Sequence, residues 1–430
     1  MAAFLGIDFG TSGARAIAVG ASKMTAVDHQ GQIVAERSRR FTPQDRLDWC
    51  GCWQRTLMDL LADLPLPIRA TLQAIAINGT SGTVILSDRT GQPLDHPLLY
   101  NEERGWAVQT TLEKLVPSNH LARSSSSSLA KLLWWSEQAI FAEAHYFLHQ
   151  ADWLGFLLHG QLGLSDYHNA LKLGYDVQKL DYPDWLANTS FRQILPQVLT
   201  PGTAIAPLKP DLAQQLQINP DCLICAGTTD SIAAFFASGA NQPGEAVTSL
   251  GSTLALKLLS QTYVEDFSSG VYSHRWGDLW LTGGASNAGG TVLKQFFSDQ
   301  ELMDLSAQID PQIISPYDYY PLPKSGDRFP INDPQLSPRL EPRPARKVDF
   351  LQAILTGLAK IEAMGYQKLQ ALGATPLTRI YTAGGGAKNA TWRAIRSQYC
   401  QVPILPSPQT EAAYGTAWLA SQSFNSRTQT

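Results

Sequence analysis

The chain has 430 residues, of which 44% are apolar, so it is long enough for two or three domains with sizeable cores. Its 33 basic and 37 acidic residues give a net charge of −4, which excludes the basic surface that nucleic acids need. No apolar stretch reaches the roughly 20 residues of a membrane span, and the first strand-like run begins almost at once, which leaves no room for a targeting peptide. We therefore expect a globular cytoplasmic protein without nucleic-acid or membrane partners.

The first feature is a turn, residues 8–13, that joins two short apolar runs with the pattern of buried strands. Its glycines allow backbone N–H groups to face a ligand, and Thr11 and Ser12 add hydroxyl donors, a combination that suits a phosphate. Asp8 would hold a cation beside that phosphate. An ordinary hairpin with an Asx-type turn explains this stretch equally well.

Several elements of the first half follow from local patterns. Residues 25–34 favour a strand, a turn and a second strand, and the apolar spacing over 49–64 predicts an amphipathic helix. Residues 72–77 favour a strand that runs into the polar loop 78–82. Ligands commonly bind in such loops at the carboxyl ends of sheet strands. The serine run 124–128 precedes a helical pattern and predicts a helix N-cap within a domain.

A second carboxylate lies at a junction between elements. Residues 223–226 favour a strand, and residues 232–238 favour a helix of small side chains. Asp230 lies between them, where the helix dipole stabilises a carboxylate, so it could accept a proton. A simple helix-capping role explains the same position.

We place a domain boundary at the next turn, which gives domains of residues 1–241 and 242–430. The second domain repeats the first hairpin, because residues 250–255 have the same pattern between two strand-like runs. The acid is the difference, since Ser249 takes the place of Asp8. Two such hairpins suggest two similar domains that bind one nucleotide tail.

The rest of the second half is rich in glycine and proline. Residues 283–290 predict a loop that opens a helix and could contact a nucleotide, although small residues also serve close packing. The proline-rich segment 316–344 predicts irregular structure before a long helix. A strand over 379–382 runs into the glycine-rich turn 383–389, and we expect a last helix over 411–421 to complete the fold.

In this order, the features resemble the superfamily of actin, hexokinase and heat-shock chaperones, and more closely the FGGY carbohydrate kinases, over nearly the whole chain. The resemblance implies an α/β fold of two actin-like (ribonuclease H-like) domains with a catalytic cleft between them, and an ATP-dependent sugar kinase that uses Mg²⁺. The motifs that carry it are Gly6-Ile7-Asp8-Phe9-Gly10-Thr11-Ser12, Ala226-Gly227-Thr228-Thr229-Asp230, Ser249-Leu250-Gly251-Ser252-Thr253, Gly326-Asp327-Arg328-Phe329-Pro330 and Thr382-Ala383-Gly384-Gly385-Gly386-Ala387-Lys388-Asn389.

The resemblance also implies a role for individual residues. Asp8 would bind Mg²⁺ and orient the γ-phosphate, and Asp230 would be the base that receives the proton of the sugar hydroxyl. Ser81 would contact the sugar beside these two acids. The remaining residues would bind ATP, namely Thr11 and Ser12, then Gly251, Ser252 and Thr253 on the phosphates, and Gly384, Gly385 and Asn389 around the adenosine.

Two departures from the family pattern bear on the substrate. Residues 78–82 replace a frequent Gln-Met-His-Gly, whose Met–His pair contacts sugar in xylulose kinases, and Glu102 replaces the Asp of a Trp-Asn-Asp-x-Arg segment. The segment Ala14-Arg15-Ala16 resembles the ribulokinase branch of the family. We expect a ketopentose, D-ribulose before D-xylulose, with a polyol such as glycerol more distant. A non-catalytic sugar or nucleotide sensor on the same scaffold is the competing interpretation, and no oligomeric state is predicted.

Overall fold

The computed structural model describes residues 2–20 and 31–427, so the predicted strand–turn–strand of residues 25–34 lies largely outside the described residues. Contacts divide the chain into two compact units. Unit 1 combines Met1–Ala237 with Glu411–Thr430, and unit 2 is Ser238–Thr410. None of the described helices combines the length and the apolar character needed to cross a membrane.

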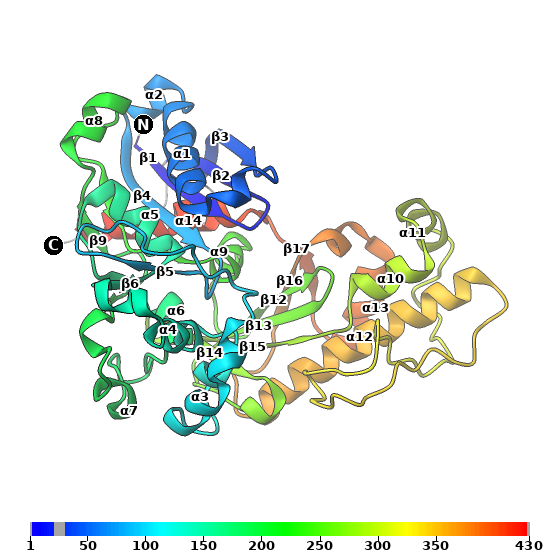
Figure 1. The fold of residues 1–430 in the computed structure, drawn as a ribbon. Coiled ribbons are helices and arrows are strands. Elements are labelled where there is room, and N and C mark those ends of the chain that lie inside the picture. The colour runs from blue at the N-terminus through cyan, green and yellow to red at the C-terminus, as the bar shows by residue number, and fades with distance from the viewer. Residues whose placement is uncertain (1, 21–30, 428–430) are drawn as a thin grey trace. The chain divides into compact units, whose positions relative to one another are not determined.

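A seven-stranded sheet forms the centre of unit 1 (Figure 1). Its strands, in spatial order, are β3 (Gln32–Arg40), β2 (Gly13–Gly20), β1 (Ala3–Phe9), β4 (Leu72–Gly79), β10 (Leu223–Cys225) and β9 (Ala204–Pro207), with β11 (Thr228–Thr229) beside β4. β1 is antiparallel to β2 and parallel to β4, and β4 is parallel to both β10 and β11. Parallel pairing brings strand carboxyl ends to one edge, where Asp8 and Thr228 are both register partners of Asn78.

The alternation of side chains along β1 divides the sheet of unit 1 into two faces. Leu5 and Ile7 join a buried core with side chains of α1 (Trp49–Ala62) and α5 (Gln150–His159). Gly6 and Asp8 belong to the other face, which α14 (Ala412–Arg427) and α9 (Asp230–Ala237) cover. Gly6 must be glycine because a Cβ there would lie 2.0 Å from the carbonyl oxygen of Ala413.

The last helix, predicted over residues 411–421, is present as α14. It packs on β1, β4 and α9 of unit 1. Its small residues explain the contact, since Gly415 leaves only 1.9 Å between a hypothetical Cβ and the carbonyl oxygen of Ala233. This close approach joins elements some 180 residues apart, which a local sequence pattern does not encode.

The remaining part of unit 1 consists of short elements around two small sheets. The strands are β5 (Val84–Ser87) with β6 (Tyr146–His149), and β7 (Leu164–Asp166) with β8 (Gln197–Leu199). The helices are α2 (Leu66–Arg69), α3 (Gln109–Leu115), α4 (Ser128–Ser136), α6 (Tyr167–Ala170), α7 (Asp184–Ala187) and α8 (Pro210–Leu216). The serine run caps α4 as predicted, because the Ser127 side chain accepts a hydrogen bond from the N–H of Ala130.

Unit 2 contains a six-stranded sheet. Its strands, in spatial order, are β14 (Tyr272–Trp276), β15 (Leu279–Ser286), β13 (Leu254–Ser260), β12 (Glu245–Leu250), β16 (Arg379–Ala383) and β17 (Ile404–Pro406). Its helices are α10 (Gly290–Phe296), α11 (Asp299–Ser306), α12 (Lys347–Ala371) and α13 (Ala390–Cys400), and α12 lies alongside α13 (Figure 1).

One prediction for this unit needs correction. We expected residues 283–290 to form a glycine-rich loop, but β15 extends to Ser286. Gly283 and Gly284 serve packing, since a Cβ on the first would lie 2.0 Å from the carbonyl oxygen of Leu256 and one on the second 2.6 Å from the ring of Phe329. Only the last part of the predicted loop precedes a helix, α10.

A buried polar cluster connects β12 and β16 to the helices beneath them. The Arg396 guanidinium donates two hydrogen bonds to Glu362, at 2.6 and 2.7 Å, and one to Thr382 at 2.9 Å. Thr248 donates to the same carboxylate and contacts the hydroxyl of Tyr366 at 2.8 Å. All five side chains are buried, so the cluster fixes α12 and α13 against the two strands that lead into the predicted nucleotide loops.

Candidate functional site

Asp8 is a half-buried carboxylate at the carboxyl end of β1. Its Oδ1 atom is buried and has no hydrogen-bond partner among the described residues. Burial, together with the negative charges of Asp230 and Glu411, raises the pKa of Asp8 to about 7, and the Arg15 charge opposes this shift. Arg15 itself forms ion pairs with Glu36 and Glu411. A site that disfavours a bare carboxylate is one that a cation would complete.

Asp230 is the first residue of α9, as the sequence predicted, and its Oδ1 accepts a hydrogen bond of 2.6 Å from the N–H of Ser231. It is half-buried, and its charge acts on Asp8, so the two carboxylates are neighbours. The strand before it is held in place because Thr228 bonds to Nδ1 of His168 at 2.7 Å.

Two further buried oxygen atoms lie at the same sheet edge. Thr416 on α14 donates its hydroxyl proton to a backbone carbonyl, so it must accept the 2.7 Å hydrogen bond from Nδ2 of Asn78. This bond orients the Asn78 amide. Among the described residues, neither its Oδ1 atom nor Oγ1 of Thr229 has a hydrogen-bond partner. The edge thus presents oxygen ligands, which Mg²⁺ prefers.

In the loop after β4, the side chains of Thr80 and Thr83 are hydrogen-bonded within the fold, whereas that of Ser81 is not bonded to any described residue. Thr80 and Thr83 bond to each other at 2.5 Å, and Gln150 accepts from the N–H of Thr80 at 3.0 Å. The Ser81 hydroxyl makes no hydrogen bond within the described part of the chain, and its backbone oxygen lies 3.5 Å from Nζ of Lys172. Burial lowers the pKa of Lys172 and the Asp230 charge opposes the shift, so this lysine is close to both predicted sugar-side residues.

The first hairpin closes as predicted between β1 and β2. The N–H of Gly10 donates to the carbonyl of Gly13 at 3.0 Å, and the N–H of Phe41 donates to the carbonyl of Ser12 at 2.9 Å. The hydroxyls of Thr11 and Ser12 are exposed and bond to none of the described residues. A Cβ on Gly10 would meet no atom closer than 3.6 Å, so the fold does not require glycine there and its surface is open to a ligand.

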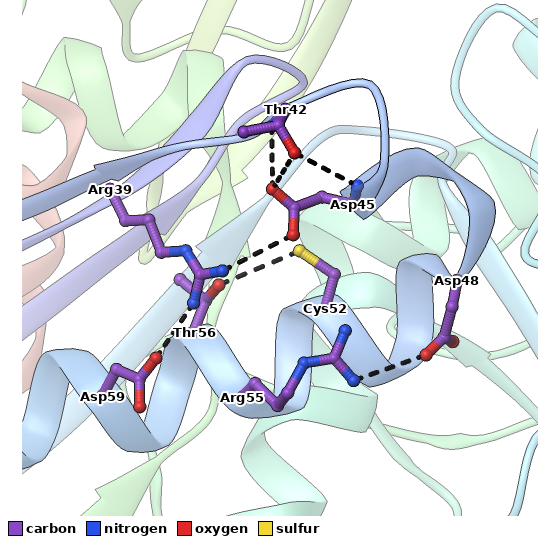
Figure 2. Close-up of polar contacts among 8 residues, drawn as sticks. All are labelled: Arg39, Thr42, Asp45, Asp48, Cys52, Arg55, Thr56 and Asp59. Carbon is purple, nitrogen blue, oxygen red and sulfur yellow. Dashed lines mark hydrogen bonds and ion pairs between the residues drawn. The ribbon is translucent and has the colours of Figure 1, made fainter.

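A polar network holds the neighbouring end of β3, as Figure 2 shows. Arg39 lies between two carboxylates, 2.9 Å from Asp59 on α1 and 3.5 Å from Asp45. The Asp45 carboxylate accepts from the backbone and the hydroxyl of Thr42 at 2.8 and 2.9 Å, and these hydrogen bonds lower the pKa of Asp45. The network fixes the residues on both sides of Phe41, which anchors the hairpin turn.

The second hairpin has the same open character in unit 2. The N–H of Gly251 donates to the carbonyl of Thr253 at 3.2 Å, and a Cβ on Gly251 would meet nothing closer than 3.7 Å. The start of α10 supports the turn, because the N–H of Gly290 donates to Gly251 at 2.8 Å and Thr291 donates to the carbonyl of Ser252. Ser252 and Thr253 have no side-chain hydrogen bonds among the described residues.

The glycine-rich turn after β16 combines structural and open positions. Gly384 has φ = +83° and lies against the backbone of Leu250, so the fold requires it, whereas nothing lies near a Cβ on Gly385. The Asn389 side chain caps α13 through the N–H of Trp392 at 2.9 Å and donates to Ser306 at 2.8 Å. Its amide therefore already serves the fold.

Sequence reasoning missed several charged neighbours of this site. Lys172 lies in a region without a clear pattern, and Glu411 precedes the last helix, whose packing on unit 1 a local pattern does not encode. Lys131 carried a signal, because it is the one charge in the apolar run 129–135.

Comparison with known proteins identifies the family. Residues 3–237 match the N-terminal domain of the FGGY family of carbohydrate kinases, and residues 246–424 match its C-terminal domain. Together these matches cover nearly all of the chain, so it belongs to the FGGY family and is an ATP-dependent sugar kinase.

Individual relatives are distant but nearly complete. A xylulose kinase of Staphylococcus epidermidis is 22% identical over 96% of this chain and 88% of its own length. An L-fuculokinase of Salmonella typhi is 25% identical over 93% of this chain and 87% of its own length. The solved xylulose kinase of Rhodospirillum rubrum superposes with a TM-score of 0.82 at 20% identity, covering 97% of this chain and 89% of that one. The expected α/β fold of two actin-like domains is confirmed.

Proposed function

We propose that this kinase transfers the γ-phosphate of ATP directly to a hydroxyl group of a ketopentose, with Asp230 as the general base. The observation that carries the proposal is the pair of neighbouring carboxylates at one sheet edge, one with an unpartnered buried oxygen and one at a helix start. Phosphoryl transfer depends on positioning and charge neutralisation more than on covalent chemistry, and this edge offers both.

The residues present fit Mg²⁺, because a buried carboxylate oxygen without a partner is a hard ligand that a hard cation would satisfy. Asp8 would hold the ion, directly or through water, with the Asn78 amide oxygen nearby. When bound, Mg²⁺ neutralises charge on the transferring phosphate.

The two hairpins would bind the phosphates of ATP. Gly10 and Gly251 have room for a close approach, and the hydroxyls of Thr11, Ser12, Ser252 and Thr253 are available as donors. Gly385 is open to the adenosine, whereas Gly384 and Asn389 would shape that pocket through the backbone, since packing and capping already occupy them.

Asp230 would take the proton of the attacking hydroxyl as the bond to phosphorus forms. A carboxylate with an ordinary pKa of about 3.9 is a weak base for an alcohol, so the proton leaves late in the reaction. The N-terminus of α9 favours the ionised form that can receive it.

Two observations bear on which ketopentose is the acceptor. Arg15 suggested D-ribulose, but its guanidinium pairs with Glu36 and Glu411 and so has a role within unit 1. Since several relatives are xylulose kinases, D-ribulose and D-xylulose are both first-line acceptors, with Ser81 as a sugar contact. The odd number of cysteines, five, fits a reducing compartment, and together with the need for ATP it supports a cytoplasmic location.

The direct test measures ADP release with Mg²⁺, ATP and a panel of pentuloses, fuculose, gluconate and glycerol. We expect sugar-dependent ADP, highest with a ketopentose. Binding of sugar without turnover would instead support the sensor.

The base is tested by Asp230→Ala, which should lower kcat by about 10²–10⁴-fold and leave the KM for ATP nearly unchanged. A variant that phosphorylates sugar at the parent rate would exclude this role. Asp221→Ala, an exposed acid in the turn that precedes β10, serves as the control and should behave like the parent.

A further inference from the structure

Lys131 is a lysine with no exposed surface. It lies in α4 between apolar residues, and Leu129, Leu132 and Trp135 of the same helix are fully buried as well. Its ammonium group donates two short hydrogen bonds to backbone carbonyls, 2.6 Å to Gly82 and 2.7 Å to Leu99. No ion pair to Lys131 occurs among the described residues.

This arrangement is unfavourable for the fold by itself. Removing an ammonium group from water without an opposite charge in contact disfavours the charged form. Burial, and after it the charge of the nearby Lys172, lowers the pKa of Lys131 to about 7 against the opposing charge of Glu102. An apolar residue such as methionine would fill the space without this penalty, so the lysine must serve another purpose.

The two carbonyls belong to two segments of the acceptor side. Gly82 directly follows Ser81 in the loop after β4, and Leu99 directly precedes the charged segment 100–104. The segments also meet through the hydroxyl of Thr83, which accepts from the N–H of Tyr100 at 3.0 Å. One ammonium group therefore bridges a backbone carbonyl of each segment.

The same loop is already held at its other end. Gln150 accepts from the N–H of Thr80, and the Thr80 and Thr83 hydroxyls bond to each other. With both threonines bound, the remaining freedom of the loop is at Ser81 and Gly82, whose φ of +84° few other residues could adopt. The Lys131 ammonium group holds the carbonyl of Gly82, and so acts on this part of the loop.

We propose that Lys131 is a positioning residue for the acceptor sugar, which fixes Ser81 and the segment 100–104 relative to each other and to Asp230. It would not touch the sugar. This inference rests on the proposed function, because it assumes that the Ser81 loop binds the acceptor.

The test compares Lys131→Met, which keeps the length and removes the charge, with Lys131→Arg, which restores a cation and several donors. We expect Lys131→Met to raise the KM for the best sugar about tenfold or more, because small displacements of a binding group strongly weaken its contacts. The KM for ATP and the sugar-independent ATPase rate should stay at parent values, and Lys131→Arg should recover part of the loss.

Leu132→Met is the matched control, since Leu132 is equally buried on the same helix and makes no polar contact with the loop. It should leave both KM values unchanged. If Lys131→Met retains the parent KM for sugar, or raises the KM for sugar and for ATP equally, the positioning role is wrong.

Failure of the proposed function would be visible in the parent protein, as the absence of sugar-dependent ADP. In that case, calorimetric binding of the same sugar to the parent and to Lys131→Met still decides the inference, because equal dissociation constants, or no binding to either protein, would overturn it.

Discussion

Five strands in the sheet of each unit have the same order and directions, but the residue before the turn of the hairpin differs. In unit 1 the order β3-β2-β1-β4-β10 matches β15-β13-β12-β16-β17 in unit 2. In each, an antiparallel hairpin pairs with a parallel strand from later in the sequence. Asp8 in one sheet corresponds to Ser249 in the other, so only the first hairpin carries an acid.

The hairpins also differ in how their turns are made. Four residues separate the last paired positions Phe9 and Ala14, whereas three separate Leu250 and Leu254. The turn of unit 1 is supported by β3, and that of unit 2 by the start of α10. One backbone arrangement thus occurs twice, with a carboxylate before the turn in unit 1 and a hydroxyl in the same place in unit 2.

The largest expected effects come from exchanging Asp8 and Ser249, the residues that distinguish the two hairpins. Asp8→Ser makes the first hairpin like the second, and we expect kcat/KM to fall about 10³-fold because the proposed cation ligand is lost. Ser249→Asp makes the second like the first and should raise the KM for ATP about tenfold, since the new charge repels the phosphates. Steady-state kinetics with varied Mg²⁺ measures both, and a fully active Asp8→Ser variant would remove the basis of the comparison.

A buried ion pair of unit 2 can be compared with an exposed ion pair of unit 1. Glu362→Gln leaves the buried guanidinium of Arg396 without its counter-charge, and we expect a loss of about 3–5 kcal/mol in the free energy of unfolding of unit 2. Asp59→Ala removes the exposed partner of Arg39 in unit 1 and should change stability by less than about 1 kcal/mol. Urea denaturation measures both, and equal losses would contradict this difference.

Two glycines of the first hairpin, Gly6 and Gly10, are expected to differ in their effects on stability and on ATP binding. Gly10→Ala has room for its Cβ and should keep the parent melting temperature, while the KM for ATP rises about tenfold because the methyl group would hold the phosphates away from the turn. Gly6→Ala would place its Cβ against α14 and should fail to fold or melt far lower. Thermal unfolding together with ATP titration distinguishes them, and a Gly10→Ala variant with parent affinity would argue against close phosphate approach.

A pH dependence of stability is also expected. Burial lowers the pKa of Lys131 to about 7, below the roughly 10.4 of an unfolded lysine, so between these values the unfolded chain binds more protons. Stability of the parent relative to Lys131→Met should therefore rise from pH 7 towards pH 10, by at most about 1.4 kcal/mol per pH unit. Parallel denaturation curves at pH 7, 8 and 9 measure the difference, and a constant offset would contradict it.

How much of the molecule the sequence predicts depends on the range of the interaction involved. The two hairpins, the cap at Ser127 and the start of a helix at Asp230 follow from neighbouring residues, and the structure has each of them. The motifs also predicted the family, because several of them occur in a fixed order.

Contacts between distant segments were not predictable. The 2.6 Å bond from Lys131 to Gly82 joins positions 49 residues apart, and the glycines at 283 and 284 looked like a ligand loop because local composition does not distinguish ligand approach from strand packing. The same limit applies to the packing of the last helix on unit 1.

The position of α14 has a consequence for how the chain is made. The helix that covers one face of β1 leaves the ribosome about 400 residues after β1 itself, with all of unit 2 synthesised between them. Until then, the nascent first sheet lacks the cover that Gly6 is shaped to accept. The face of the sheet that carries Asp8 is therefore covered only after unit 2 has been synthesised.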